Sequence, residues 1–148
     1  MSNDQSPKLG EYQGITYSRR VHYHDTDAAG VVYHGNYFRF CEEARTDIFW
    51  RLVNMSLKDF ETKYGIGFVI SKAVAEYRRP VLAEAIVTVK TYIEDFGVVR
   101  TKYRQEIFVG DELCALIRLD AAAVSSATFK PAKMPQDLIS AYKAGFGL

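Results

Sequence analysis

Residues 21–44 read VHYHDTDAAGVVYHGNYFRFCEEA and join a polar loop to the beginning of an amphipathic helix. The loop contains all three histidines of the chain, together with two aspartates and a glycine. Beyond Gly35 the apolar side chains recur at steps of three and four residues, as expected for one buried face of a helix; they are Tyr37, Cys41, Ala44, Ile48 and Leu52. Such a helix cannot bury its apolar face alone, so a sheet has to curl around it.

The rest of the chain supplies strands for that sheet. Ile15 to Tyr23 has the composition of a strand, and a brief second helix opens at Ser56 with a relaxed capping box and stops before Gly65. Period-two alternation then predicts four antiparallel strands in a meander, at residues 73–77, 85–93 and 99–109 and after the turn at 109–112. A short helix follows from Pro135. The predicted fold class is α+β, a curved antiparallel sheet around one long central helix.

Length, charge and cysteine content limit what the chain can do. Its 148 residues fit one domain, and we expect a flexible N-terminal leader over 1–13, polar and unlike a signal peptide, before a single domain over 14–148. The formal net charge of +1 gives no field for nucleic acid, and no apolar run approaches the roughly 18 residues of a membrane span. Cys41 and Cys114 lie in apolar periodic segments, which favours buried free thiols and a cytoplasmic location.

The polar loop has the groups that acyl transfer at a carbonyl requires. Such a reaction needs a carboxylate that attacks or activates water, and donors for the developing oxyanion. Asp27 offers the first, and the backbone N–H groups of His34 and Gly35 at the helix N-terminus offer the second. Simpler roles stay open: Asp27 can hold a turn, and His34 can donate from its ring, orient Asp27 or cap the helix.

Other residues of the same run are weaker candidates. His22 and His24, two apart on the predicted strand, would share a face, but only one further histidine exists, so we expect no metal site. Glu42 and Arg45 are spaced to pair along the helix.

The loop and the helix that follows it also carry a family resemblance. Residues 25–34, DTDAAGVVYH, followed by Asn36–Tyr37 and by EEART at 42–46, closely resemble the hot-dog-fold acyl-CoA thioesterases of the 4-hydroxybenzoyl-CoA thioesterase family, especially the branch associated with the Tol–Pal gene cluster. The resemblance continues more weakly through EYRRP at 76–80 and KPAKMP at 130–135. It therefore covers about residues 15–135.

The resemblance implies a fold and a set of roles. It implies a hot-dog fold in which Asp27 is the catalytic carboxylate, Asp25 is structural, and the backbone N–H of His34 polarises the thioester carbonyl. It also implies active sites at the interface of a homo-oligomer, a dimer or a dimer of dimers (a homotetramer).

Tyr33 and Tyr37 are candidates for contacts with the substrate, and Glu43 is a minor candidate base because related thioesterases of this fold use a helix glutamate, although a place on the solvated helix face explains it more simply. A CoA phosphate could be held by Arg78–Arg79, by the face of Arg100, Lys102 and Arg104, or by Lys130 and Lys133. We favour Lys130 and Lys133 because they flank the prolines of the family-like segment.

We therefore expect a thioesterase that hydrolyses an aromatic or short-chain acyl-CoA to the free acid and CoA, with Asp27 as nucleophile or general base. No metal or organic cofactor is expected, nor a nucleic-acid partner or stable membrane insertion. One alternative is a non-catalytic protein of the same fold that binds acyl groups or CoA. Another is an acyl dehydratase or hydratase of the same fold, which would need a histidine base paired with an acid on a different element.

Overall fold

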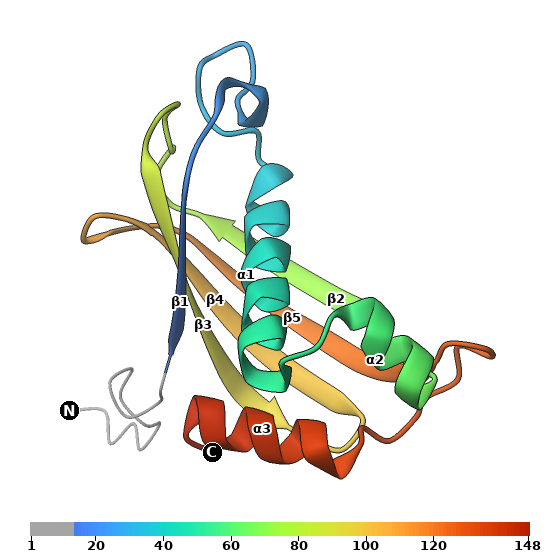
Figure 1. The fold of residues 1–148 in the computed structure, drawn as a ribbon. Helices are drawn as coiled ribbons and strands as arrows, with labels where there is room; N and C mark the ends of the chain where they lie inside the picture. The colour runs from blue at the N-terminus through green and yellow to red at the C-terminus, as the bar shows by residue number, and fades with distance from the viewer. Residues whose placement is uncertain (1–13) are drawn as a thin grey trace.

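The computed structural model describes residues 14–148, and the predicted leader over 1–13 lies outside the described residues. Along the chain the elements are β1 (Ile15–Arg20), the short 3-10 helix η1 (Tyr23–Asp25), α1 (Asn36–Val53), α2 (Leu57–Tyr64), β2 (Ile66–Tyr77), β3 (Ile86–Phe96), β4 (Arg100–Val109), β5 (Glu112–Ser125) and α3 (Gln136–Phe146). Figure 1 shows α1 lying across the concave face of a curved sheet, with α3 below its C-terminal end. The predicted fold class is confirmed.

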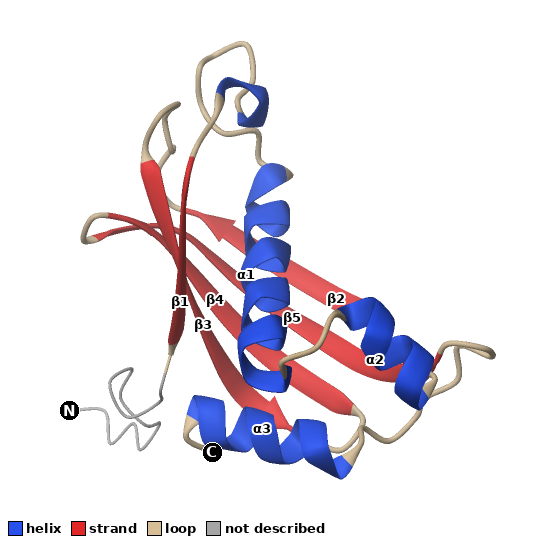
Figure 2. Ribbon diagram, viewed as in Figure 1, coloured by secondary structure: helices blue, strands red, loops and turns tan. Residues whose placement is uncertain are grey.

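The sheet has five antiparallel strands in the order β1-β3-β4-β5-β2 (Figure 2). The two predicted hairpins join β3, β4 and β5. The prediction of a continuous four-strand meander is wrong, because β2 pairs with β5 and not with β3. The backbone N–H groups of Arg78 and Arg79 both donate to Cys114 O, which holds the end of β2 against β5 before the chain crosses to β3.

The helix α1 buries one face against the inner face of the sheet. Its buried side chains are Tyr37, Phe40, Cys41, Ala44, Ile48 and Phe49. Phe40 is wholly buried and was absent from the predicted apolar set, whereas Leu52 at the end of that set is only partly buried. Cys41 and Cys114 are both buried free thiols, as predicted.

Two strand boundaries differ from the prediction. β1 ends at Arg20 because the chain turns into η1, so His22 and His24 lie beyond the strand and not on it. β2 begins at Ile66 and not near Ala73. Its first residues are a continuous apolar run with a glycine, so they lack the alternation on which the prediction rested.

The predicted boundaries of α2 and the predicted start of α3 are correct. The Ser56 hydroxyl accepts a hydrogen bond from the backbone N–H of Asp59 and caps α2, which ends at Gly65 with a φ of +66°. α3 begins directly after Pro135. Within residues 14–148, no helix has the length and apolarity to cross a membrane.

Candidate active site

The loop between β1 and α1 is organised around a buried carboxylate, that of Asp25. Its side chain is 0% exposed, and its Oδ2 accepts hydrogen bonds from Arg19 Nη2 at 2.7 Å and from the backbone N–H of His22 at 2.9 Å. Its backbone carbonyl accepts from the Tyr33 N–H at 3.0 Å and from Asn36 Nδ2 at 2.7 Å. Asp25 therefore ties both ends of the loop together.

Asp27, two residues later, is exposed and lies in a tight turn. Its Oδ1 accepts the backbone N–H of Ala29 at 2.8 Å, and its own N–H and C=O pair with Val31 and Gly30. Gly30 has a φ of +79°, a conformation that favours glycine. Asp27 does hold a turn, but only one of its oxygens is used, and Oδ2 accepts no hydrogen bond from the described residues.

The first turn of α1 begins beside this loop, and its backbone supplies free donors. The N–H of Asn36 donates to Tyr33 O at 2.8 Å, whereas the N–H groups of His34 and Gly35 donate to no acceptor among residues 14–148. Gly35 already has helical angles, with φ −67° and ψ −22°. A Cβ at this position would lie 2.9 Å from the ring of Tyr33, so that half-exposed ring would have to shift in a substituted variant. The helix thus presents unpaired amides at its positive end.

Aromatic rings surround the start of α1. The rings of Tyr33 and His34 lie 4.3 Å apart, and the ring of Tyr77 lies 5.2 Å from that of Tyr37. Tyr77 Oη donates to the backbone oxygen of His34 at 2.9 Å. Burial raises the pKa of Tyr37 and of Tyr77. Tyr77 was not predicted as a site residue, and the signals for it were its place at the end of an alternating strand and within the family-like segment at 76–80.

Glu43 is neither free nor on a fully solvated face. Both of its carboxylate oxygens accept from Arg19 Nη1, at 3.0 and 3.1 Å. Arg19 thus bridges the carboxylates of Glu43 on α1 and Asp25 in the loop. This bridge fixes the loop relative to the helix and occupies the carboxylate that was the minor candidate for a base.

The predicted phosphate ligands lie far from this end of the molecule. β5 runs antiparallel to β2, with Ala115 opposite Tyr77 and Ser125 opposite Ile66, so these two positions of β5 are roughly 33 Å apart. Tyr77 contacts His34 at one end, and Lys130 O accepts the N–H of Ser125 at the other. Lys130 and Lys133 are exposed there. One chain therefore does not bring the two lysines to Asp27, whereas Tyr33, Tyr37, His34 and Gly35 do lie at its end of α1.

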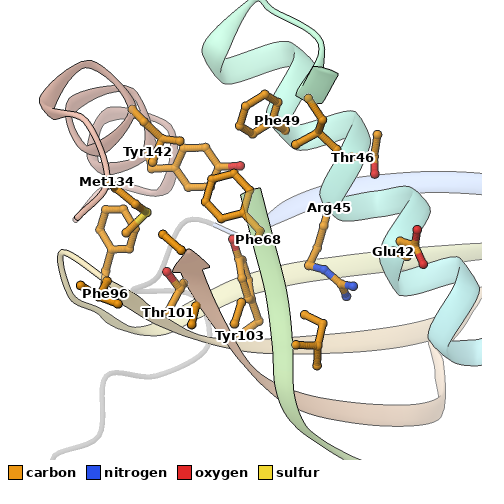
Figure 3. Close-up of a pocket in the computed structure, with 17 residues that line it drawn as sticks. Glu42, Arg45, Thr46, Phe49, Phe68, Phe96, Thr101, Tyr103, Met134 and Tyr142 are labelled. Carbon is orange, nitrogen blue, oxygen red and sulfur yellow. The ribbon is translucent and has the colours of Figure 1, made fainter. Parts of the chain in front are cut away.

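A cavity of about 340 Å³ lies between α1, α3 and the inner face of the sheet (Figure 3). Five aromatic side chains of the described residues line it among small and aliphatic ones: Phe49, Phe68, Phe96, Tyr103 and Tyr142. Arg45 extends into it and donates from Nη1 to Gln105 Oε1 at 2.8 Å. The expected pairing of Arg45 with Glu42 does not form, because Arg45 turns toward the sheet.

The described part of the chain holds no group of three or more His, Cys, Asp or Glu side chains placed to bind a metal ion. The rings of His22 and His24 stack with centroids 5.6 Å apart, and both are exposed.

Comparison with known proteins identifies the family to which the chain is similar. A family model described as the thioesterase-like superfamily matches residues 21–142. The chain is 30% identical over 127 residues to the acyl-CoA thioesterase YbgC of Helicobacter pylori, covering 86% of this chain and 81% of that protein. It is 27% identical over 125 residues to the 1,4-dihydroxy-2-naphthoyl-CoA hydrolase of Nostoc punctiforme, covering 84% of each. The solved structure of a DHNA-CoA thioesterase from Staphylococcus aureus superposes with a TM-score of 0.77 and 31% identity, covering 90% of this chain and 89% of that one.

Proposed function

The chain belongs to the thioesterase-like superfamily, and from that premise we propose that it hydrolyses aromatic or short-chain acyl-CoA thioesters with Asp27 as the catalytic carboxylate. The backbone N–H groups of His34 and Gly35 are the proposed oxyanion donors. The relatives named for 1,4-dihydroxy-2-naphthoyl-CoA and DHNA-CoA, together with the aromatic cavity, favour an aromatic acyl group. The Tol–Pal branch remains a prediction.

One observation carries this proposal: a free carboxylate oxygen and two unpaired amides lie in one loop. Asp27 Oδ2 and the N–H groups of His34 and Gly35 have no partner among residues 14–148. Asp27 and the two amide-bearing residues are close in the sequence. Asp25 is hydrogen-bonded to residues at both ends of the loop that joins them. We infer that these amides are oriented in advance to stabilise the negative charge that develops on the thioester carbonyl oxygen during hydrolysis.

The chemistry follows two routes that share these groups. In one, Asp27 removes a proton from water as the water oxygen attacks the thioester carbon. In the other, Asp27 attacks that carbon itself, and water then hydrolyses the resulting anhydride. In both routes the carbon–sulfur bond breaks, the electron pair leaves with the CoA sulfur, and a proton from water completes the thiol. The helix amides stabilise the oxyanion in each.

The test is the Asp27→Asn variant, assayed with a panel of acyl-CoA esters and a thiol reagent. Asparagine keeps an oxygen for the Ala29 N–H, so the turn survives, but it neither attacks a carbonyl nor accepts a proton from water. We expect turnover to be nearly abolished, with Asp111→Asn, an exposed turn aspartate, as the unaffected control. A loss below roughly tenfold would remove Asp27 from the centre of the mechanism. A non-catalytic binder would release no thiol in the wild type.

The assembly that we propose is a homodimer paired along β2. β2 is an edge strand with exposed apolar side chains, among them Phe68, Val69, Ile70 and Val74 at 38–50% exposure. A long apolar edge of this kind favours pairing with a second copy. A two-fold axis through the middle of β2 would place the second β2 antiparallel to the first, so that its Tyr77 end faces the Ile66 end of the first.

This pairing would bring together groups that one chain keeps apart. Tyr77 contacts His34, so the catalytic loop of each subunit would approach the Ile66 end of the other. Phe68 and Ile70 at that end line the cavity, and Lys130 is hydrogen-bonded to β5 beside it. Lys130 and Lys133 of one subunit would then be candidates for the CoA phosphates at Asp27 of the other. Arg78 and Arg79, exposed after β2, are alternative cations on the same chain as Asp27.

A cytoplasmic location is part of the proposal. It is supported by Cys41 and Cys114, which are buried and unpaired, as cysteines are in reducing compartments.

A further inference from the structure

The cavity beneath α1 contains a cation that no carboxylate neutralises. Arg45 is partly buried, and within residues 14–148 it forms no ion pair with an Asp or Glu side chain. Burial is the main cause that lowers the pKa of Arg45, and Glu42 at the cavity margin opposes the effect only by its longer-range charge. The positive charge of this partly buried guanidinium has no paired carboxylate among the described residues. Such a charge lowers the stability of the fold unless a bound ligand supplies the negative charge.

The position of that guanidinium is fixed by a buried glutamine. Gln105 is 0% exposed, and its Nε2 donates to Cys41 O at 3.0 Å and to Thr91 Oγ1 at 2.9 Å. With both donors used, its Oε1 must face Arg45 Nη1. Arg45 Nε and Nη2 donate to no described residue, and neither is enclosed by protein atoms. These two nitrogens are therefore available to a ligand in the cavity.

Most side chains around Arg45 are apolar, and Glu42 at the cavity margin is the one carboxylate among the described residues that line the cavity. Phe49, Phe68 and Phe96 present rings to the space, as Figure 3 shows. Burial raises the pKa of Tyr103 to about 12 and that of Tyr142 well above its ordinary value, so both phenols stay protonated at neutral pH. The cavity thus combines aromatic walls with one fixed cation, and its volume of about 340 Å³ is within the range of small-molecule sites.

We propose that this cavity receives an aromatic acyl group with an acidic ring substituent, and that Arg45 pairs with the substituent. The inference rests on the proposed thioesterase function and specifies its acyl group. A carboxylate accepts two parallel hydrogen bonds from a guanidinium, and its negative charge would neutralise the positive charge of Arg45. An unsubstituted ring would leave the cation unpaired, and a site built to pair a polar group discriminates strongly against analogues that lack the group. Arg45 is thus a specificity-determining residue and takes no part in the bond-breaking step.

The experiment compares kcat/KM for 3- and 4-carboxybenzoyl-CoA with kcat/KM for benzoyl-CoA, in the wild type and in Arg45→Met. We expect the wild type to prefer one of the carboxylated esters by about tenfold or more, and the variant to lose that preference while still hydrolysing benzoyl-CoA. Arg45→Lys, which keeps the charge without the planar fork, should retain part of it. Arg51→Met removes an exposed arginine from the same helix and should leave the ratio unchanged.

A second measurement separates this inference from the proposed function. Isothermal titration of benzoate, benzene-1,3-dicarboxylate and benzene-1,4-dicarboxylate into the full chain measures binding without any hydrolysis. Tighter binding of a dicarboxylate, lost in Arg45→Met or weakened in Arg45→Lys, supports the inference even if no acyl-CoA is hydrolysed. Hydrolysis with equal kcat/KM for the neutral and carboxylated esters would overturn the inference and leave the thioesterase proposal standing. A ratio that is the same in wild type and Arg45→Met would also overturn it.

Discussion

Asp25 and Asp27 are separated by one residue and have opposite environments. Asp25 is buried and accepts from Arg19 and from the loop backbone, whereas Asp27 is exposed and keeps one oxygen free. Each carboxylate has one oxygen without a hydrogen bond from the described residues, but that of Asp25 is buried and that of Asp27 belongs to an exposed side chain. The buried carboxylate organises its surroundings, and the exposed one can react with a ligand. This difference divides the two aspartates into a positioning residue and the proposed catalytic residue.

The positioning role of Asp25 predicts a large stability effect. Asp25→Asn removes the negative charge beside Arg19 Nη2 at 2.7 Å and leaves a partly buried arginine paired only with Glu43. Removing one member of a buried ion pair typically costs about 3–5 kcal/mol. We expect a loss of the free energy of unfolding of about 3 kcal/mol in urea titrations. Asp47→Asn, which removes a surface pair with Arg51, should cost about 0.5 kcal/mol or less; equal losses would contradict the assignment.

The oxyanion donor can be tested with a matched pair of substitutions at Gly35. Both Gly35→Ala and Gly35→Pro place a Cβ near the ring of Tyr33, and the φ of −67° suits proline. Only proline removes the N–H. Because proline also restricts His34, helix content has to be checked by circular dichroism. We expect kcat to fall about tenfold or more further in Gly35→Pro than in Gly35→Ala; equal rates in two folded variants would exclude this amide as a donor.

The imidazole of His34 is predicted to be dispensable. It packs against Tyr33 and donates to no acceptor among the described residues, whereas the His34 amide is retained in any non-proline variant. His34→Ala should therefore keep measurable hydrolysis in the thiol-release assay. A folded His34→Ala protein as inactive as Asp27→Asn would show that the ring itself takes part.

Residues of the local loop were predictable from sequence, and residues of the cavity were not. Asp27, His34 and Gly35 are within eight positions of one another in the sequence, so a turn followed by a helix was enough to predict that they belong to one loop and the helix start that follows it. Arg45 depends on Gln105, sixty positions away, and the nearby Glu42 offered a simpler partner. Gln105 alternates with charged residues on β4, and nothing local indicated that it would be the one polar side chain to meet α1.

At the scale of elements, the strand β2 departs most from the sequence pattern. The helices and the β3-β4-β5 hairpins follow from local periodicity and turn residues, and they were predicted. The partner of β2 is β5, which lies some forty residues further along the chain, and local alternation contains no information about such a pairing. Most residues of β2 are exposed on both faces, so the strand also lacks the alternation of a half-buried one.

If two subunits pair along β2, a charged side chain introduced on β2 should dissociate the dimer. Val74 is 50% exposed on β2, and Val98 is 52% exposed in the β3–β4 turn, away from that edge. Lysine on an edge strand opposes strand pairing by charge and by hydration. Sedimentation velocity should show Val74→Lys shifted toward monomer, with Val98→Lys unchanged. A shift in both variants or in neither would place the contact elsewhere.

At the scale of the whole molecule, the proposed catalytic groups and the proposed acyl site are on opposite parts of a curved sheet. Figure 1 shows the loop before α1 at one end and α3 with the loop after β5 at the other. The cavity extends from Glu42 on α1 to Leu138 and Tyr142 on α3. Pairing along β2 would bring the loop of one subunit to the cavity of its neighbour, so that neither chain alone would hold a complete site.

This arrangement predicts that two inactive chains restore each other. Asp27→Asn removes the catalytic carboxylate, and Thr46→Trp fills the cavity from α1 while leaving the loop intact. Each homodimer should be inactive. Co-expressed chains carrying different affinity tags should form mixed dimers with one complete site, because the intact loop of one chain meets the open cavity of the other. A random mixture should then recover about a quarter of wild-type turnover, since half of its dimers are mixed and each has one site of two. Purified mixed dimers with no more activity than the parents, in which circular dichroism shows both chains folded, would mean that loop and cavity of the same chain form the site.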